Sequence, residues 1–365
     1  MQLNKIKMAI IGQGRSGRDI HGLWLQSEQN DLYEVVAIVE ADADRRVRAA
    51  QEWPNAKILS DYTELFAMKE EVELVVNASY SQDHYSITKD LLEHDFNVLV
   101  EKPFGANRYE CNNLLRIAKE RKLMLAVFQQ TLMSPMFMKA KKFAESGKLG
   151  EIQQVSIRYN GFSRRWDWQT LQCCVAGGVY NTGPHPLGFA LGFLDFHEET
   201  RVIYSKLACT EMNSGDSDDY AKVLLTAPGK PLVDVEISSI DAFNDFTIKI
   251  QGSRGTFKAK VAGEYWAKYI EPGVNPERPV SKTFIQKEDG TPAYCGEELI
   301  AVEEHETFNN NFMTYSDNFY RMLYKHMRLW NPLIIKPEYA AQVISVIETV
   351  HAQNPLPVKF GFDKE

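Results

Sequence analysis

The sequence predicts an α/β protein with an N-terminal doubly wound parallel sheet, followed by an α+β region with a large, mostly antiparallel open sheet. Over the first third of the chain, short apolar runs alternate with helical patterns, as in parallel sheets flanked by helices. A glycine-rich turn directly follows the first apolar run. Beyond residue 150 the strand patterns follow one another, separated by turn signals such as Pro228-Gly229.

Residues 1–128 are expected to form the parallel domain. The predicted strands span residues 5–11, 33–39, 57–59, 72–78, 97–100 and 123–128. The predicted helices lie between them, at residues 18–28, 42–52, 62–69, 84–93 and 108–121. A strand that helices cover on both faces is apolar throughout, so a run such as Val98-Leu99-Val100 indicates the buried centre of the sheet.

Residues 129–365 are expected to form the second domain. After a helix at 135–145, the predicted strands span residues 153–159, 202–210, 220–225, 232–238, 246–251 and 256–261. Residues 264–294 are rich in proline, glycine and charge, so an irregular excursion is expected there. Helices at 307–330 and 337–353 close the chain and could pack back on the first domain.

Composition and charge limit the classes of function. The 365 residues carry a net charge of −8, whereas nucleic-acid-binding proteins usually present a basic face. No apolar run approaches the roughly 18–20 residues that span a bilayer, and the N-terminus lacks a signal-peptide pattern. The five cysteines form neither a disulfide framework nor a metal-binding spacing. We therefore expect a cytoplasmic protein without a metal site that binds neither nucleic acid nor membrane.

The turn after the first strand has the pattern G-x-G-x-x-G of dinucleotide-binding loops. It comprises Gly12, Gln13, Gly14, Arg15, Ser16 and Gly17. In such loops the first glycine permits the tight turn, the second lets backbone approach a pyrophosphate, and the third allows close packing of helix on strand. Amide groups at the start of the next helix then face the phosphates. With this loop on its first strand, the parallel domain is predicted to be a Rossmann domain.

An acidic residue ends the second predicted strand, where dinucleotide-binding domains contact the ribose. Glu40 would hydrogen-bond the 2′-hydroxyl and repel a 2′-phosphate, which favours NAD. Arg45 and Arg46 follow closely and could host a 2′-phosphate, so NADP stays an alternative. These charges could equally be solvated residues at a strand end and on the next helix.

The strand at 97–100 leads directly into Glu101-Lys102-Pro103. Ligands of open parallel sheets bind outside the carboxyl ends of the strands, so a lysine here is aimed at whatever the sheet binds. Pro103 stiffens the turn and biases Lys102 toward an extended conformation. Lys102 is therefore a candidate catalytic residue, although a surface lysine after a strand would give the same pattern.

The segment 164–192 holds the remaining candidates. Asn181 and His185 are four residues apart at the start of a predicted helix, so they would share one face. An imidazole held beside an amide can serve as an acid/base group, although a lone histidine can also be structural. Nearby aromatic and polar side chains suit a sugar ring, or equally a packed loop or a subunit contact. These are Arg164, Trp166, Asp167, Trp168 and Gln169.

In this order, the glycine loop, the E-K-P turn and the G-x-H motif resemble the glucose–fructose oxidoreductase/inositol dehydrogenase/MocA family. The resemblance covers most of the chain. It implies an NAD or NADP cofactor and the oxidation or reduction of a hydroxyl on a sugar, inositol or related polyol. It also implies that Lys102 contacts the nicotinamide and the reacting oxygen, that His185 is the acid/base, and that Glu101 shapes the turn. Ser79 and His84 lie in a segment similar to one of the family's cofactor-side segments.

Three positions depart from the family pattern. Asn181 stands where the family commonly has the aspartate of D-x-x-x-H, Gly188 replaces an aspartate, and Leu132 replaces an arginine. An amide can position a neighbour but cannot accept a proton. Asp167 is therefore a candidate for the missing acid.

The resulting hypothesis is hydride transfer between nicotinamide and a secondary hydroxyl of a sugar, polyol, inositol or glycoside. His185 is the first candidate for the base, with Lys102 stabilising the alkoxide. If His185 is weakly basic, Lys102 with a lowered pKa takes its place. The alternatives are redox-assisted glycoside cleavage with recycled NAD, and a non-catalytic, sugar-sensing regulator. The resemblance also implies a homodimer or homotetramer that buries one face of the second sheet.

Overall fold

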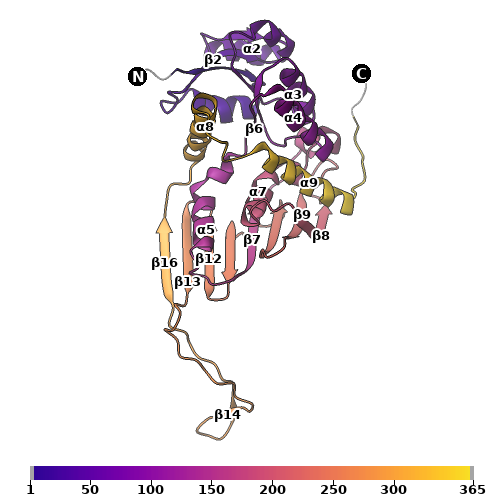
Figure 1. The fold of residues 1–365 in the computed structure, drawn as a ribbon. Coiled ribbons are helices and arrows are strands. Elements are labelled where there is room, and N and C mark those ends of the chain that lie inside the picture. Colours follow the sequence, from indigo (N-terminus) through magenta and orange to yellow (C-terminus); the bar gives the residue numbers. More distant parts are fainter. Residues whose placement is uncertain (1–3, 362–365) are drawn as a thin grey trace.

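The computed structural model describes residues 4–361, so the outermost residues of the two expected domains lie outside it. Its N-terminal part up to residue 128, here called the first half, contains a six-stranded parallel sheet in the order β3-β2-β1-β4-β5-β6 (Figure 1). The strands are β1 (Ile6–Ile11), β2 (Tyr33–Val39), β3 (Lys57–Leu59), β4 (Leu74–Asn77), β5 (Asn97–Val100) and β6 (Leu125–Val127). The strand order reverses direction between β1 and β4, and ligands of such sheets bind at this switch point.

Helices cover both faces of this sheet. They are α1 (Leu23–Leu25), which continues a π-helical turn at Arg15–Gly22, α2 (Ala43–Glu52), α3 (His84–Glu93) and α4 (Arg108–Arg121), with 3-10 turns at Tyr62–Met68 and Ser81–Asp83. Alternate residues of one strand enter two different cores. Val98 and Val100 of β5 pack with α3 and α4, whereas Leu99 packs in the cluster that contains Trp24 of α1. This arrangement explains the continuous apolar runs of the sequence.

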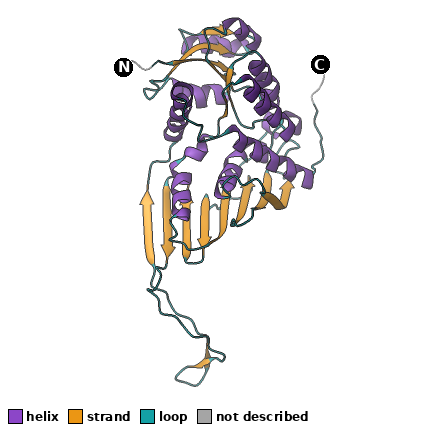
Figure 2. Ribbon diagram, in the orientation of Figure 1, coloured by secondary structure: helices purple, strands orange, loops and turns teal. Residues whose placement is uncertain are grey.

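The second sheet has eight strands in the order β16-β13-β12-β11-β7-β10-β9-β8 (Figure 2). The strands are β7 (Ile152–Asn160), β8 (Arg201–Ala208), β9 (Tyr220–Thr226), β10 (Leu232–Ser238), β11 (Ile248–Gly252), β12 (Gly255–Lys260), β13 (Glu264–Tyr269) and β16 (Val302–Thr307). β7 and β10 are parallel, and the other neighbouring strands are antiparallel. The predicted fold class is thus confirmed.

One face of this sheet is covered by helices and the other is open (Figure 1). The helices of the second half are α5 (Pro135–Glu145), α6 (Gly178–Asn181), α7 (Pro184–Phe193), α8 (Phe312–Leu329) and α9 (Pro337–Gln353), with 3-10 turns at Gln130–Met133, Trp168–Thr170 and Gln172–Cys174. Of these, α5, α7 and α9 lie over the sheet, while α8 returns to the first sheet, where Phe319 and Leu323 join the core of Trp24.

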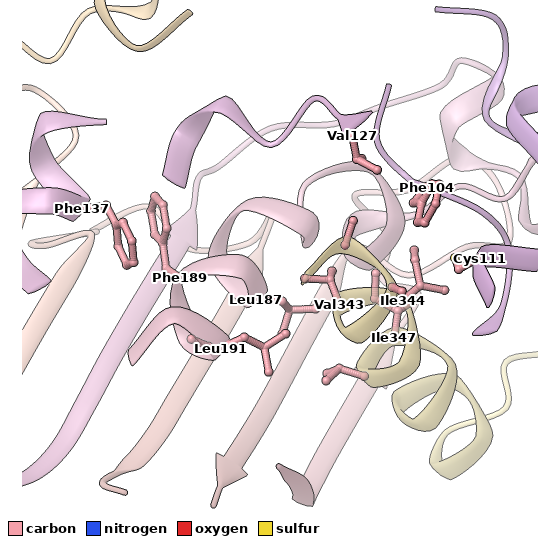
Figure 3. Packing of buried hydrophobic residues seen from close by; sticks show 14 of the residues in the cluster. Phe104, Cys111, Val127, Phe137, Leu187, Phe189, Leu191, Val343, Ile344 and Ile347 are labelled. Carbon is pink, nitrogen blue, oxygen red and sulfur yellow. The ribbon is translucent and has the colours of Figure 1, made fainter. Parts of the chain in front are cut away.

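A single buried cluster joins the two halves (Figure 3). Leu187 of α7 and Val343 and Ile347 of α9 belong to it, and so do Phe104 and Val127 from the first half. Figure 3 shows the α9 side chains between α7 and Phe104. The two parts of the chain are therefore packed against each other through a shared hydrophobic core.

The prediction of an irregular excursion at residues 264–294 is partly wrong. Glu264–Tyr269 forms β13, in which the alternate residues Tyr265, Ala267 and Tyr269 face the helices. The closing helix expected from residue 307 begins at Phe312 instead, where the Asn311 side chain caps it, and residue 307 ends β16. The helix expected at 18–28 begins earlier, with the π-helical turn, and the one expected at 62–69 is 3-10.

Residues 270–301, here called the arm, connect β13 to β16 as a long hairpin that projects beyond the sheet (Figure 1). Only β14 (Ile285–Gln286) and β15 (Pro292–Ala293) pair regularly within it.

Candidate active site

A cavity of about 710 Å³ lies at the carboxyl ends of the parallel strands. Its walls include Gly12 and Gly14 of the glycine loop, Lys102 after β5, and His185 at the start of α7. Residues from both halves of the chain thus converge on one space, which is large enough for an extended ligand.

The glycine loop fits a dinucleotide because side chains are excluded from it. Gly12 has φ +89°, and a Cβ there would lie 2.4 Å from the Ala78 carbonyl oxygen. A Cβ at Gly17 would lie 1.8 Å from the Gly12 carbonyl oxygen. The loop therefore presents bare backbone at the start of a helix, which is the surface that binds a pyrophosphate.

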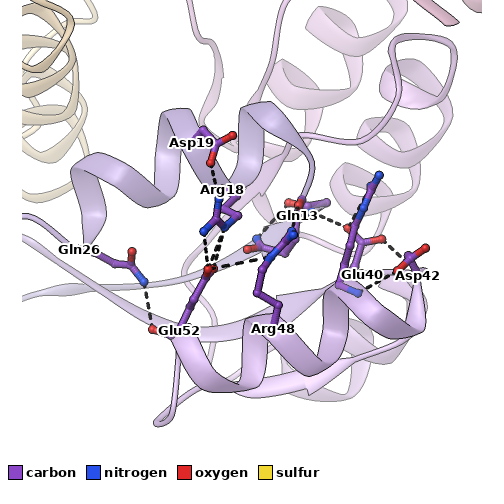
Figure 4. Close-up of polar contacts among 10 residues, drawn as sticks. Gln13, Arg18, Asp19, Gln26, Glu40, Asp42, Arg48 and Glu52 are labelled. Carbon is purple, nitrogen blue, oxygen red and sulfur yellow. Dashed lines mark hydrogen bonds and ion pairs between the residues drawn. The ribbon is translucent and has the colours of Figure 1, made fainter. Parts of the chain in front are cut away.

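Glu40 lines the cavity, but it is almost fully buried and backbone amides hold both of its carboxylate oxygens. Its Oε2 accepts a hydrogen bond from the Gln13 amide at 2.6 Å, and its Oε1 accepts one from the Asp42 amide at 2.9 Å (Figure 4). The Arg45 guanidinium lies 3.9 Å from Oε2, and both side chains line the cavity. A carboxylate and a guanidinium thus lie together where the ribose was expected to bind. Both residues had been predicted from the sequence.

Lys102 enters the cavity through a turn with a cis Lys102–Pro103 peptide bond. Its Nζ donates a hydrogen bond to the Asn181 carbonyl oxygen at 3.0 Å, and its backbone amide donates to Glu101 Oε2 at 3.0 Å. Burial lowers the pKa of Lys102, the positive charges of Arg15 and Arg165 lower it further, and Glu101 opposes them. A lysine with a lowered pKa can lose its proton and act as a base.

Glu101 is held from below by two side chains that the sequence reasoning missed. His21 Nε2 lies 3.1 Å from Glu101 Oε1, and His21 Nδ1 lies 2.6 Å from the hydroxyl of Tyr320 on α8. Burial by itself would raise the pKa of Glu101, but the close contact with His21 and the positive charges of His21 and Lys102 lower it. Glu101 is therefore a buried carboxylate that keeps its charge beside Lys102.

His185 is partly buried, and its hydrogen-bond partner is a threonine. Its Nδ1 lies 3.0 Å from Thr131 Oγ1, while Nε2 makes no hydrogen bond within residues 4–361. Burial and the nearby charge of Lys102 lower the pKa of His185 to about 3. The imidazole is therefore neutral at physiological pH.

Asn181 and His185 both line the cavity, but their side chains make no hydrogen bond to each other. Asn181 ends the short helix α6, and His185 belongs to α7. The Asn181 side chain donates to the Gln169 carbonyl oxygen at 2.8 Å, which leaves Oδ1 buried and without a partner in the described chain.

The segment 164–169 divides into residues inside and outside the cavity. Arg165, Asp167, Trp168 and Gln169 line it, whereas Arg164 and Trp166 do not, and Trp166 is 79% exposed. The Arg165 guanidinium pairs with Asp167 at 2.9 Å.

The residues expected to hold the cofactor also fall into two groups. Four of them line the cavity: Arg15, Ser16, Ser79 and Glu101. Gln13 and Gly17 belong to the glycine loop but are buried and do not line the cavity. His84 is buried, with Nδ1 2.7 Å from the Pro103 carbonyl oxygen and Nε2 3.2 Å from the Ser79 carbonyl oxygen. His84 therefore ties the turn that carries Lys102 to the loop after β4.

Thr131 lies in the 3-10 turn that follows β6, at the same end of the sheet as Lys102. The rule that identified Lys102 could have identified Thr131 too, but the residue lacked a motif to draw attention to it. His21 and Tyr320 carried no comparable signal. They are 299 positions apart, and tertiary packing alone brings them together.

A Rossmann glycine loop and a partly buried lysine share one cavity, the arrangement of an oxidoreductase with an NAD-binding domain. Residues 6–129 match the model "Oxidoreductase family, NAD-binding Rossmann fold", and residues 137–258 match the GFO/IDH/MocA C-terminal domain. The chain belongs to the Gfo/Idh/MocA family of oxidoreductases, which confirms the family and the NAD cofactor predicted from the sequence motifs.

Several known proteins are similar along much of their length. An uncharacterised oxidoreductase of Schizosaccharomyces pombe is 31% identical over 260 residues, 69% of each chain. The scyllo-inositol 2-dehydrogenase (NADP⁺) IolW of Bacillus subtilis is 24% identical over 95% of this chain and 93% of its own. The structure of GenD2 from gentamicin A biosynthesis, in complex with NAD, superposes with a TM-score of 0.75 at 18% identity, and the match covers 96% of this chain and 95% of GenD2. The last comparison establishes a shared fold.

Residues 4–361 contain neither a metal-binding cluster nor a membrane-spanning helix. Histidine, cysteine and carboxylate side chains do not gather there into a group that could hold a metal ion. Each helix in that range is too short or too polar to cross a membrane.

Proposed function

We propose that the protein transfers a hydride between nicotinamide and a secondary hydroxyl of a sugar, polyol, inositol or glycoside. The observation that carries this proposal is the convergence of Lys102 and His185 on the cavity that also holds the glycine loop. A lysine with a lowered pKa and a neutral imidazole suit proton transfer from a hydroxyl. Residues 1–128 would bind the cofactor, and residues 129–365 would complete the substrate site.

The dinucleotide would lie with its pyrophosphate on the backbone of Gly12 and Gly14 and its adenosine ribose near Glu40. When bound, the nicotinamide supplies the ring carbon that accepts or donates the hydride. Glu40 favours NAD, because it would repel a 2′-phosphate. Arg45 lies close enough to receive that phosphate if Glu40 gives way, and the name of the Bacillus subtilis relative specifies NADP⁺.

Of the two candidate bases, the pKa directions favour Lys102. A pKa of about 3 leaves His185 with little tendency to take a proton, whereas the pKa of Lys102 shifts downward, toward physiological pH. The two groups also interact, since the charge of Lys102 depresses the pKa of His185. We therefore assign the role of proton acceptor to Lys102. His185 is then a neutral hydrogen-bond partner that orients the substrate hydroxyl.

Thr131 takes the positioning role that the family's aspartate would have beside His185. If Nδ1–H donates to Thr131 Oγ1, Nε2 keeps its lone pair for the substrate. Thr131 is thus a positioning residue, acting through His185.

The substrate class rests on polar and aromatic groups that line the cavity. The side-chain amide of Asn181 and the carboxylate of Asp167 can accept hydrogen bonds from hydroxyl groups, and Trp168 offers a flat apolar face. Acceptors beside a flat ring suit a polyhydroxylated ring. The Bacillus subtilis relative, named for scyllo-inositol, is consistent with such a substrate.

The test is an absorbance assay with NAD or NADP and a panel of inositols, sugars, sugar acids and glycosides. Growth of the reduced-nicotinamide band with one substrate class is the expected result. Product analysis runs in parallel, because released aglycone without net cofactor reduction would indicate glycoside cleavage instead. Cofactor binding without any turnover across the panel would contradict the proposal and favour a sensing role.

We also propose that the protein acts in the cytoplasm and forms a homo-oligomer. Its five cysteines are free thiols, as expected under reducing conditions. The open face of the eight-stranded sheet is available to a second subunit.

A further inference from the structure

The arm, residues 270–301, is exposed along its whole length. No residue in it is buried. Its exposed large apolar side chains are Val274, Val280, Phe284, Ile285, Tyr294, Leu299 and Ile300. Val280 and Tyr294 are 90% and 89% exposed. Apolar side chains gathered at this density on a projecting segment mark a contact surface.

Few contacts hold the arm together. Asn275 and Ile300 exchange two hydrogen bonds, Arg278 pairs with Glu297, and the rings of Phe284 and Tyr294 meet edge to face at 5.6 Å. These contacts pair the arm with itself and leave its apolar side chains uncovered. A lone two-stranded hairpin is only marginally stable in water, so a partner surface would stabilise the arm.

The charge of the arm limits what that partner can be. The arm has three basic residues and six acidic ones, for a net charge of −3. The acidic residues are Glu271, Glu277, Glu288, Asp289, Glu297 and Glu298. This charge disfavours nucleic acids and anionic lipid surfaces, and it favours a basic protein surface.

The open face of the eight-stranded sheet offers such a surface, here called the lysine face. It comprises Lys249 of β11, Lys258 and Lys260 of β12, and Trp266 and Lys268 of β13. Lys260 and Lys268 have carboxylate neighbours, Glu264 at 3.9 Å and Glu303 at 2.8 Å. In the described chain, Lys249 and Lys258 have no carboxylate within 4.0 Å.

These two unneutralised lysines stand directly opposite each other in the β11–β12 register. Like charges in opposite positions destabilise a sheet, so an anionic partner on this face would relieve the repulsion. The neighbouring Trp266 ring offers an apolar surface, with the ammonium groups of Lys258 and Lys260 at 5.0 and 5.3 Å from its centre.

We propose that the arm of one protomer docks on the lysine face of a second copy of the chain. In a two-fold dimer this contact occurs twice. Carboxylates of the arm meet Lys249 and Lys258, and its apolar side chains pack around Trp266. The inference rests on the self-association proposed above and names the surfaces that produce it.

The first experiment measures dimer dissociation by sedimentation velocity for the full chain. Variants replace residues 273–298 with a short Gly-Ser turn, or combine Lys249→Glu with Lys258→Glu. Each variant should raise the dissociation constant by at least ~10-fold while leaving NAD binding unchanged. Lys206→Glu, on β8 at the far edge of the sheet, is the matched control and should not weaken the dimer.

A second experiment uses Cys295, the exposed thiol of the arm. A thiol-to-amine cross-linker should join Cys295 to Lys249 or Lys258 of a differently labelled copy. A monomeric wild-type protein would overturn both this inference and the proposed self-association. A dimer that tolerates both variants, or cross-links that remain within one chain, would overturn the docking alone. Neither outcome bears on the proposed hydride transfer.

Discussion

His21 Nε2 lies 3.1 Å from Glu101 Oε1, and both side chains are buried under the turn that presents Lys102. His21 belongs to the helical turn that follows the glycine loop, so this contact joins the loop predicted to bind the cofactor to the predicted catalytic turn. The Tyr320 hydroxyl lies 2.6 Å from His21 Nδ1 and extends the chain of contacts to α8. The helical turn after the glycine loop and the turn that carries Lys102 are thus both connected to α8.

His21→Leu should destabilise the protein, because it removes the ion-pair partner of the buried Glu101 carboxylate. The expected loss is about 1–3 kcal/mol in the free energy of unfolding, measured by urea titration. Since His21 helps to lower the pKa of Glu101, its stabilising contribution is present above the ordinary pKa of a glutamate and is lost as pH falls. The loss should therefore be larger at pH 7 than at pH 4.

Tyr320→Phe tests the same chain of contacts more gently. It removes one hydroxyl and should cost about 1 kcal/mol. Tyr324→Phe, on the same helix, removes a longer hydrogen bond of 3.3 Å and is the matched control. Equal effects of the two variants, or a His21→Leu loss that does not vary with pH, would contradict a specific role for the His21–Glu101 contact.

Lys102→Ala should lower kcat by roughly 100- to 10,000-fold without loss of NAD binding, as expected when a general base is removed. Lys102→Arg separates charge from proton transfer, because a guanidinium keeps its proton. If Lys102 is the base, the arginine variant should be as slow as the alanine variant. Near-wild-type turnover with arginine would show that the positive charge alone suffices.

The pH profile of the oxidation direction gives an independent check. The neutral amine is the active form, so kcat/KM should rise with pH, with a midpoint below 10.5 because the pKa of Lys102 is lowered. His185, with a pKa of about 3, should add no limb near pH 6.5. A limb near pH 6.5 that disappears in His185→Asn would return the role of base to His185.

The fold was largely predictable because the parallel strands are buried on both faces and carry continuous apolar runs. The errors fall where this signal fades. β16 reads Val-Glu-Glu-His-Glu-Thr, which shows too little hydrophobicity to mark a strand at the edge of a sheet. β13 lies beside proline- and glycine-rich sequence and was absorbed into the expected excursion.

The candidate site was predictable only where a local motif carries it. The glycine loop and Lys102 follow strands directly, so position in the sequence determines position in the sheet. The partner of His185 could not be predicted in the same way, because Thr131 lies 54 positions away. Hydrogen bonds of this kind depend on packing between elements, which the sequence pattern does not encode.

Thr131→Val should lower kcat more than it changes KM. The substitution keeps the shape of the side chain but removes the hydroxyl that lies 3.0 Å from His185 Nδ1. Loss of one orienting hydrogen bond of about 1–1.5 kcal/mol corresponds to roughly a 5- to 10-fold loss in rate. Thr131→Ser should restore most of the activity. Equal losses with valine and serine would indicate packing rather than orientation of the imidazole.

Asp218→Asn should stabilise the protein above pH 7 and have little effect near pH 4. The side chain of Asp218 is buried, with Oδ2 accepting the Val179 amide at 2.8 Å and Oδ1 unpartnered among residues 4–361. Burial raises the pKa of Asp218 to about 7. The folded state therefore favours the neutral carboxyl, and stability is lost as pH rises from the ordinary value near 4 through 7.

Asparagine keeps an acceptor for Val179 and removes this penalty, so the gain over wild type should grow between pH 4 and pH 7. Each pKa unit corresponds to about 1.4 kcal/mol, and water entry on ionisation reduces the effect, so we expect roughly 1–4 kcal/mol at pH 8. His351 Nε2, 3.9 Å from Asp218, has a pKa lowered to about 4 by burial. The contribution of His351 to stability increases with pH, in the opposite direction to that of Asp218. Because His351 is present in both proteins, its contribution cancels in the difference between them. Urea titrations of both proteins at pH 4, 6 and 8 measure this difference, and a constant difference would show that Asp218 is ionised throughout and paired in the folded state.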